Sequence, residues 1–252
     1  YGGGVTFHVP INEYDTFSLG STLDMTKLEL AGSAPQQYRN YCTSVSSGTT
    51  CDTSSLLVFS GWEMDTLDNA IFPQEGKKLI LNADITAPIL DVKYFRVGFS
   101  SQQFIPLSPE VTTRVKADFG YIDAYGGDVL PFYKMFHVGG QKTIRGFKEA
   151  SVGKKVYDST YKSFITNGGN STIQLSTETF FPVPGIKKNE SLRMSAFIDG
   201  GGVFDDGIKF EEMRFSFGAA GVWISPFGPL SISYAIPLND NGRDKIEQFQ
   251  FG

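Results

Sequence analysis

The sequence predicts an all-β protein whose antiparallel strands form a transmembrane β-barrel with one long loop docked in its lumen. Apolar and polar side chains alternate with a period of two along many segments, which places each set on one face of a sheet. Glycine (28 residues) and phenylalanine (22 residues) are abundant, as expected for many strands joined by turns. The segments that read as strands are 1–11, 16–30, 55–65, 78–88, 93–106, 111–123, 170–183, 191–204, 212–225, 229–239 and 244–252.

The alternation has the form expected of a barrel that faces lipid. Residues 113–121 show it clearly, and so do 78–85, 191–199 and 230–238. A soluble sandwich or a lipocalin-like barrel also alternates, but with its apolar face inward. Charges in the middle of strands instead favour an apolar face toward lipid and a polar face toward a wet lumen. These charged residues are Arg96, Arg114, Lys116, Asp118, Arg193, Asp199 and Arg214.

Aromatic residues and connection lengths agree with a membrane barrel. Aromatic side chains near strand ends suit the girdles at the two membrane interfaces; they are Phe180, Phe181, Trp223, Phe227 and Tyr234. Short connections (11–15, 107–110, 184–190 and 226–228) alternate with longer ones that include 31–54 and the long loop 124–169. We expect no amphipathic helix, and the sequence has no run of about 18 apolar residues, as a transmembrane helix would need.

Composition and charge exclude several functions. The net charge is −5 and the pI is about 5.1, which argues against nucleic acid as a partner because phosphate binding needs a basic footprint. His8, His137 and the two cysteines match no zinc-binding spacing, so no metal and no cofactor is expected. Cys42 and Cys51 enclose a polar loop, and we expect a structural disulfide between them in an oxidising compartment.

Residues 139–147 are the most informative part of the long loop. They place one arginine, Arg145, among glycines that permit unusual backbone shapes and close approach. Considered alone, Arg145 is a solvated loop residue, as most surface arginines are. Strand parity, however, puts Glu178 and Asp199 on the polar faces of neighbouring strands. A guanidinium suits two carboxylate acceptors, so we expect Arg145 to dock between them.

Several motifs resemble one family. Gly139, Gly140, Ile144, Arg145, Gly146 and Phe147 resemble the characteristic loop motif of the BamA family of outer-membrane protein insertases. Residues 7–14, 131–133, 225–230, 233–235 and 244–251 look like strands and turns of the same family. The closing run 244–251 is the most specific of these matches, and the likeness extends over the whole chain.

The resemblance implies a sixteen-stranded family barrel, of which residues 1–252 would supply about eleven strands as a partial barrel domain. Tyr1 opens in mid-strand without a signal peptide, so we expect a mature or trimmed segment with periplasmic repeats upstream. Arg145 matches the loop arginine that reaches into the lumen, and Glu178 and Asp199 look like the wall acids that receive it. Phe249, Gln250, Phe251 and Gly252 match the start of the last strand, whose weak pairing with the first strand forms a lateral seam.

The function implied is assembly and insertion of outer-membrane barrel proteins at that seam, without bond chemistry, in the outer membrane of a Gram-negative bacterium. The implied partners are outer-membrane lipids, unfolded barrel proteins as clients, and accessory outer-membrane lipoproteins. One alternative is a related secretion barrel or pore that translocates a partner protein. Another is a hydrolase that uses Glu178 and Asp199, but the sequence supplies no leaving-group machinery for it.

Overall fold

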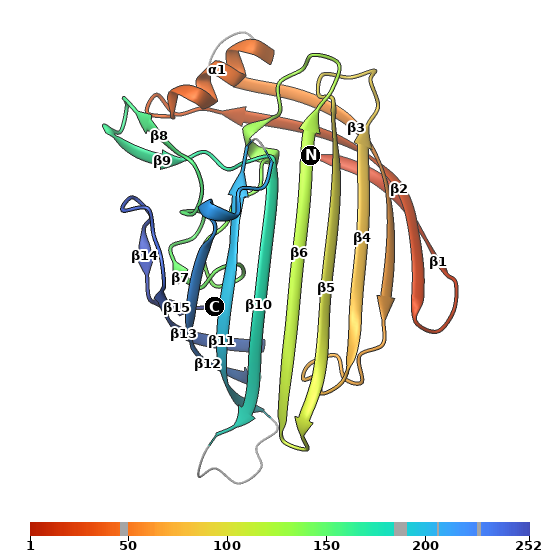
Figure 1. The fold of residues 1–252 in the computed structure, drawn as a ribbon. Coiled ribbons are helices and arrows are strands. Elements are labelled where there is room, and N and C mark those ends of the chain that lie inside the picture. Colours follow the sequence, from red (N-terminus) through yellow and green to blue (C-terminus); the bar gives the residue numbers. More distant parts are fainter. Residues whose placement is uncertain (46–49, 184–190, 206, 226–227) are drawn as a thin grey trace.

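The main sheet has eleven strands. The computed structural model describes all residues except 46–49, 184–190, 206 and 226–227 (Figure 1). The strands pair antiparallel in the order β1-β2-β3-β4-β5-β6-β10-β11-β12-β13-β15. They are β1 (Gly2–Pro10), β2 (Asp15–Glu29), β3 (Thr50–Asp65), β4 (Gly76–Thr86), β5 (Tyr94–Ser108), β6 (Val111–Ala124), β10 (Ser171–Pro182), β11 (Leu192–Phe204), β12 (Arg214–Ser225), β13 (Gly228–Pro237) and β15 (Phe249–Phe251).

The predicted all-β, antiparallel class is confirmed, and the strands lie close to the predicted segments. Apart from the last predicted strand, the main difference in bounds is at β3, which begins at Thr50 and not at residue 55. The sheet curves and stays open, with β1 and β15 at its edges among the described residues (Figure 1). The expected turn 184–190 lies outside the described residues, and so do Pro226 and Phe227 of the expected turn 226–228.

The two faces of the sheet differ as the alternation predicts. On β11, Ile198 is 59% exposed, whereas its neighbours Phe197 and Asp199 are buried on the opposite face. Leu81 and Phe119, which are also apolar residues of the predicted alternation, are exposed as well. We call the face that carries Phe197 and Asp199 the inner face. Its polar side chains and the exposed apolar side chains opposite them are the pattern of a wall between a wet lumen and lipid.

The long connection between β6 and β10 lies against the inner face. It holds a short 3-10 helix η1 (Phe132–Lys134), strand β7 (Gly146–Phe147) and the hairpin of β8 (Lys155–Asp158) and β9 (Ser163–Thr166). Val138, Ile144, Phe147 and Val152 of this connection are fully buried and pack with Val203 of β11. This apolar cluster explains why the connection folds inward, because packing against Val203 removes its apolar side chains from water.

The expectation of no helix is wrong at one place, since α1 (Gln36–Val45) forms in the connection 31–54. The rings of Tyr38 and Phe132 stack at 4.0 Å, and Tyr41 meets the same Phe132 ring edge-on. A helix this short is marginal by itself. Contacts with the long loop therefore stabilise it, and sequence periodicity could not reveal them.

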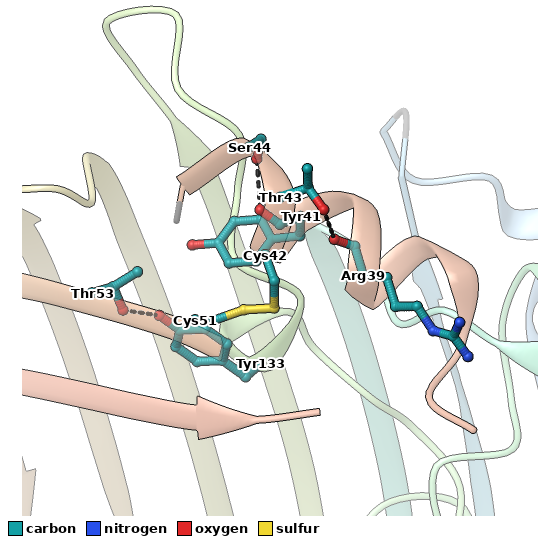
Figure 2. The surroundings of a disulfide bond; sticks show 8 residues. All are labelled: Arg39, Tyr41, Cys42, Thr43, Ser44, Cys51, Thr53 and Tyr133. Carbon is teal, nitrogen blue, oxygen red and sulfur yellow. Dashed lines mark hydrogen bonds between the residues drawn. A yellow bond between two sulfur atoms is a disulfide. The ribbon is translucent and has the colours of Figure 1, made fainter. Parts of the chain in front are cut away.

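The disulfide expected between Cys42 and Cys51 is present (Figure 2). It joins α1 to the start of β3, and both cysteines are fully buried in a cluster with Tyr41. The Tyr133 hydroxyl lies 2.9 Å from the hydroxyl of Thr53, so η1 is attached to the same strand. The disulfide is thus part of a cap that unites α1, β3 and the long loop at one end of the sheet.

Asp158 of β8 attaches the start of α1, and this contact predicts a pH dependence. Its carboxylate accepts hydrogen bonds from the backbone N–H groups of Gln36, Thr160 and Tyr161. Burial opposes the charged form, but these hydrogen bonds prevail and hold the pKa of Asp158 below its ordinary value. A lowered pKa means that the stabilisation is complete above about pH 4 and is lost as the pH falls further.

Hydrogen exchange of α1 should therefore be constant from pH 7 to about pH 5, after correction for intrinsic rates, and should accelerate below about pH 4. In Asp158→Asn the exchange should lose this acid dependence. Loosening of α1 between pH 7 and pH 5 would contradict the assignment.

The last predicted strand, 244–252, is wrong as one continuous element. Residues Ile246–Glu247 form β14, which pairs with β7 of the long loop, and only β15 pairs with β13. The reason is that two edges can pair with this segment. Residues 246–247 pair with the backbone of β7 in the loop, and the chain joins β13 only after them. No helix in the described part of the chain is long and apolar enough to cross a membrane.

Candidate functional site

Arg145 is held against the inner face by two carboxylates. Its Nε and Nη2 donate to the two oxygens of Asp199 at 2.7 and 2.8 Å, and its Nη1 donates to Glu178 Oε1 at 3.1 Å. The backbone N–H of Arg145 donates to Asp199 Oδ2 at 3.2 Å. Arg145 is 7% exposed, and both acids are buried. The fork of the guanidinium matches the Asp199 carboxylate in bidentate fashion, which is the strong form of this ion pair.

The wall supports both acids with further donors. Arg114 of β6 donates to Glu178 Oε2 at 2.6 Å, and the hydroxyl of Ser195 donates to Oε1 at 2.5 Å. Ser176 of β10 donates to Asp199 Oδ1 at 2.8 Å. Two arginines thus face two carboxylates, and the cluster is neutral overall. This neutral pairing matters because removing charges from water is costly unless each is paired.

An aromatic ring completes the site. The Cζ atom of Arg145 lies 3.3 Å from the centroid of the Phe197 ring, the position of a cation–π contact. Phe197 is the register partner of Glu178, and Asp199 is that of Ser176. The two pairs lie two residues apart along β10 and β11, so the ring and both acids share the inner face. Sequence reasoning missed Phe197, although its parity with Asp199 assigns it to the inner face. It also missed the pairing of Arg114 with Glu178.

The environment keeps Arg145 charged. Burial by itself would lower the pKa of Arg145, but the hydrogen bonds and charge of Asp199, with those of Glu178, raise it above the ordinary value. Glu178 and Asp199 are each engaged by an arginine, so neither is a free general acid or base. No group of three or more potential metal ligands occurs among the residues that the structure describes. The arrangement suits a structural fastening of the loop.

The glycines of the motif fit its close approach to the wall. Gly139, Gly140 and Gly146 all have positive φ, at 113°, 103° and 90°. A Cβ at Gly146 would also lie 3.1 Å from the Cβ of Ala235 in β13. The backbone conformation therefore favours glycine at 146, and the closeness of Ala235 leaves little room for a side chain there. Beside the motif, a cavity of about 310 Å³ remains between the loop and the inner face, lined by charged and polar groups of both.

The residues expected at the seam divide between two faces. Phe249 and Phe251 are largely exposed on the outer side of β15, whereas Gln250 is buried. The side chain of Gln250 accepts from Gly146 N–H at 3.3 Å and donates to the Phe147 carbonyl at 2.7 Å. Among the described residues, β15 has a hydrogen-bonded neighbour on one side only. The loop motif therefore touches the wall with Arg145 and the last strand with the next two residues.

Replacing Phe197 by leucine tests the aromatic contact. Phe197→Leu should ease release of the loop by about 1–2 kcal/mol, from the lost cation–π contact and imperfect repacking. The measurement is the rate of limited proteolysis within 125–169 at increasing urea. Phe99→Leu, on the exposed outer face, is the matched control and should leave that rate unchanged. Equal effects of the two substitutions would contradict the role given to the ring.

Comparisons with known proteins agree with one another. The model of the Omp85 superfamily domain matches residues 1–252. The outer membrane protein assembly factor BamA of Neisseria meningitidis serogroup B is 30% identical over 99% of the chain. A SAM50-like protein of Drosophila melanogaster is 26% identical over 75% of the chain and 42% of its own length. The chain spans 35% of the length of the Neisseria relative.

A solved structure shows the same fold. The crystal structure of BamA from Haemophilus ducreyi lacking POTRA domains 1–3 superposes with a TM-score of 0.90 at 27% identity. The match covers all of this chain and 53% of that one. The open eleven-stranded sheet thus corresponds to part of a larger barrel, which confirms the predicted fold class and the family resemblance.

Proposed function

The chain belongs to the Omp85 superfamily, and we propose that it is part of the barrel of an outer-membrane protein assembly factor. Its relatives from Neisseria and from Nitratidesulfovibrio vulgaris are named as such factors. The barrel would sit in the outer membrane of a Gram-negative bacterium, in contact with its lipids. It would insert and fold client barrel proteins without making or breaking covalent bonds, in a complex with accessory lipoproteins.

One observation carries the proposal: a single loop motif joins the wall to the last strand. Arg145 binds Asp199 and Glu178 of the wall, and Gly146 and Phe147 bind the segment that leads into β15. Among the described residues, one edge of β15 has no hydrogen-bonded neighbour, and this is the edge that would accept a client strand by β-augmentation. The loop would hold this edge in place while a client strand pairs with it.

Site-specific crosslinking in the full-length protein tests where clients bind. A photoreactive residue in place of Phe251, which lies at the exposed edge strand, should capture client barrels during their assembly. The same residue in place of Ile198 is the matched control, because Ile198 is similarly exposed but lies in the middle of the wall. Capture at both positions alike, or at neither, would contradict a role for the edge.

The secretion-barrel alternative makes a different prediction for the same experiment. A partner that passes through the lumen would be captured from Gln174, which lines the cavity beside the docked loop. Capture of an exported protein from Gln174, without capture of barrel proteins from Phe251, would favour a secretion pore over an assembly factor.

A further inference from the structure

A second buried charge cluster lies outside the Arg145 site, at the point where the chain approaches its last strand. Asp244 is its centre, and the Asp244 side chain is fully buried. Arg214 Nε donates to Asp244 Oδ2 at 2.6 Å, and Lys155 Nζ lies 3.1 Å from Oδ1 as an ion-pair contact without hydrogen-bond geometry. The side chains of Lys155 and Arg214 are only 5% and 10% exposed.

Three separate parts of the chain meet in this cluster. Lys155 begins β8 of the long loop, Arg214 begins β12 of the wall, and Asp244 stands two residues before β14. Apart from Asp244, the two cations donate to uncharged oxygens. Arg214 donates to the Glu212 carbonyl, and Lys155 donates to the Thr166 hydroxyl. Among the residues that the structure describes, Asp244 is therefore the carboxylate that compensates both. Its removal would leave two like charges facing each other in a shielded site.

Beyond Asp244, the long loop holds the chain step by step. The Lys245 carbonyl accepts from Lys148 N–H at 2.7 Å and from the Ser151 hydroxyl at 3.1 Å. The short ladder of β14 with β7 follows, and then the two hydrogen bonds of Gln250. From Asp244 to Gln250 the segment thus has partners in the loop at nearly every step.

The sheet and the loop both hold the last strand. β13 and β15 pair from Ile232↔Phe251 to Tyr234↔Phe249, and backbone hydrogen bonds continue this ladder to Ala235 with Gln248 and to Ser231 with Gly252. The register of a strand also depends on the geometry of the connection that leads into it. The anchors that precede β15 fix where the chain enters its ladder with β13.

We propose that Asp244 is a positioning residue for the last strand: clamped by Lys155 and Arg214, it sets where the chain leaves the wall and hence how β15 lies against β13 and directs its other edge. This inference rests on the proposed function, because that edge is where a client strand would pair. Asp244 itself touches no client. It acts through the loop-bound segment 244–250.

Disulfide crosslinking in the full-length protein measures the placement of β15 directly. Tyr234→Cys and Phe249→Cys are register partners across β13 and β15 and report the last strand. Ile198→Cys and Phe217→Cys, partners across β11 and β12, report the wall. The native cysteines are already joined to each other and do not compete. Each pair is introduced with and without Asp244→Asn, and the assembly of client barrels is followed in the same cells.

Asp244→Asn should lower the 234–249 crosslink at least threefold and leave the 198–217 crosslink unchanged. Asp240→Asn is the matched control, because it makes the same change at an exposed position of the same connection. Lys155→Met provides an independent test if Asp244→Asn fails to fold, with the neighbouring Lys154→Met, whose side chain is 60% exposed, as its control. Both buried-site variants should behave alike, and both controls should behave as the unmodified protein.

Unchanged 234–249 crosslinking in Asp244→Asn and in Lys155→Met would overturn the positioning role. Equal losses at 234–249 and 198–217 would also overturn it, because they would show a general structural role. A selective loss at 234–249 with undiminished client assembly upholds the positioning of β15 and counts against the proposed function. Loss of both the crosslink and client assembly supports the two together.

Discussion

Arg145→Glu is expected to release the long loop from the inner face and to abolish the assembly of client barrels. The substitution removes the three hydrogen bonds of the guanidinium and brings a third carboxylate toward Asp199 and Glu178. Breaking a buried ion pair by removing one partner costs about 3–5 kcal/mol, and charge reversal adds repulsion. The antiparallel ladders of the wall do not involve Arg145, so the barrel itself should still fold.

Two readouts separate the effect on the loop from an effect on the wall. Heat-modifiable migration reports folding of the protein's own barrel, and the same assay applied to client barrels reports assembly. Lys142→Glu is the matched control, since Lys142 lies in the same loop but is exposed. Arg145→Lys should be intermediate, because an ammonium retains the charge but loses the bidentate fork. We call the contact of Arg145 with Asp199 and Glu178 the latch. Normal client assembly in Arg145→Glu would contradict its role.

Asp199→Asn is expected to weaken the latch more than Glu178→Gln does. Asp199 accepts three of the four hydrogen bonds from Arg145, and Glu178 accepts one. Glu178 also pairs with Arg114, so Glu178 is not devoted to Arg145 alone. When Glu178 is neutralised, Arg145 keeps its ion pair with Asp199. Hydrogen bonds to charged groups contribute about 1.5–3 kcal/mol each, and the loss at Asp199 should therefore reach several kcal/mol.

Protection of the long loop against proteolysis measures this difference. The loop 125–169 should be cleaved fastest in Asp199→Asn, more slowly in Glu178→Gln, and slowest in the unmodified protein. Asp118→Asn serves as the control, because Asp118 lies on the same inner face but pairs with Lys116 and not with Arg145. Faster cleavage in Glu178→Gln than in Asp199→Asn would show that the hydrogen bonds to Asp199 are not what holds the loop to the wall.

Much of the wall can be predicted from the sequence because period two is a local property. Parity alone assigns Asp199 to one face and Ile198 to the other, and it puts Glu178 on the same face as Asp199 once β10 and β11 pair. The arginine that meets them cannot be found in this way. Its docking is predicted from the match of one guanidinium to two carboxylates and from the family resemblance, whereas the loop path between β6 and β10 that brings it there leaves no local pattern.

The features that sequence reasoning missed all depend on tertiary contacts. Helix α1 is ten residues long and owes its place to the Phe132 ring and the disulfide, neither of which leaves a periodic signal. The last strand divides because the loop edge at β7 competes with β13 for the same segment. Asp244 looked like part of a terminal motif, and only its burial between Lys155 and Arg214 shows that it anchors that segment.

The central claim is that the long loop is docked inside the barrel through Arg145 and reaches the last strands. Gln141 of the loop donates to the Ser231 hydroxyl of β13 at 2.6 Å, so these two positions report docking. Gln141→Cys with Ser231→Cys, treated with a short thiol-bridging reagent in intact membranes, should give an intramolecular crosslink in high yield. The same pair in the Arg145→Glu background should give little. Absence of the crosslink in the otherwise unmodified protein, or its persistence in Arg145→Glu, would contradict the account.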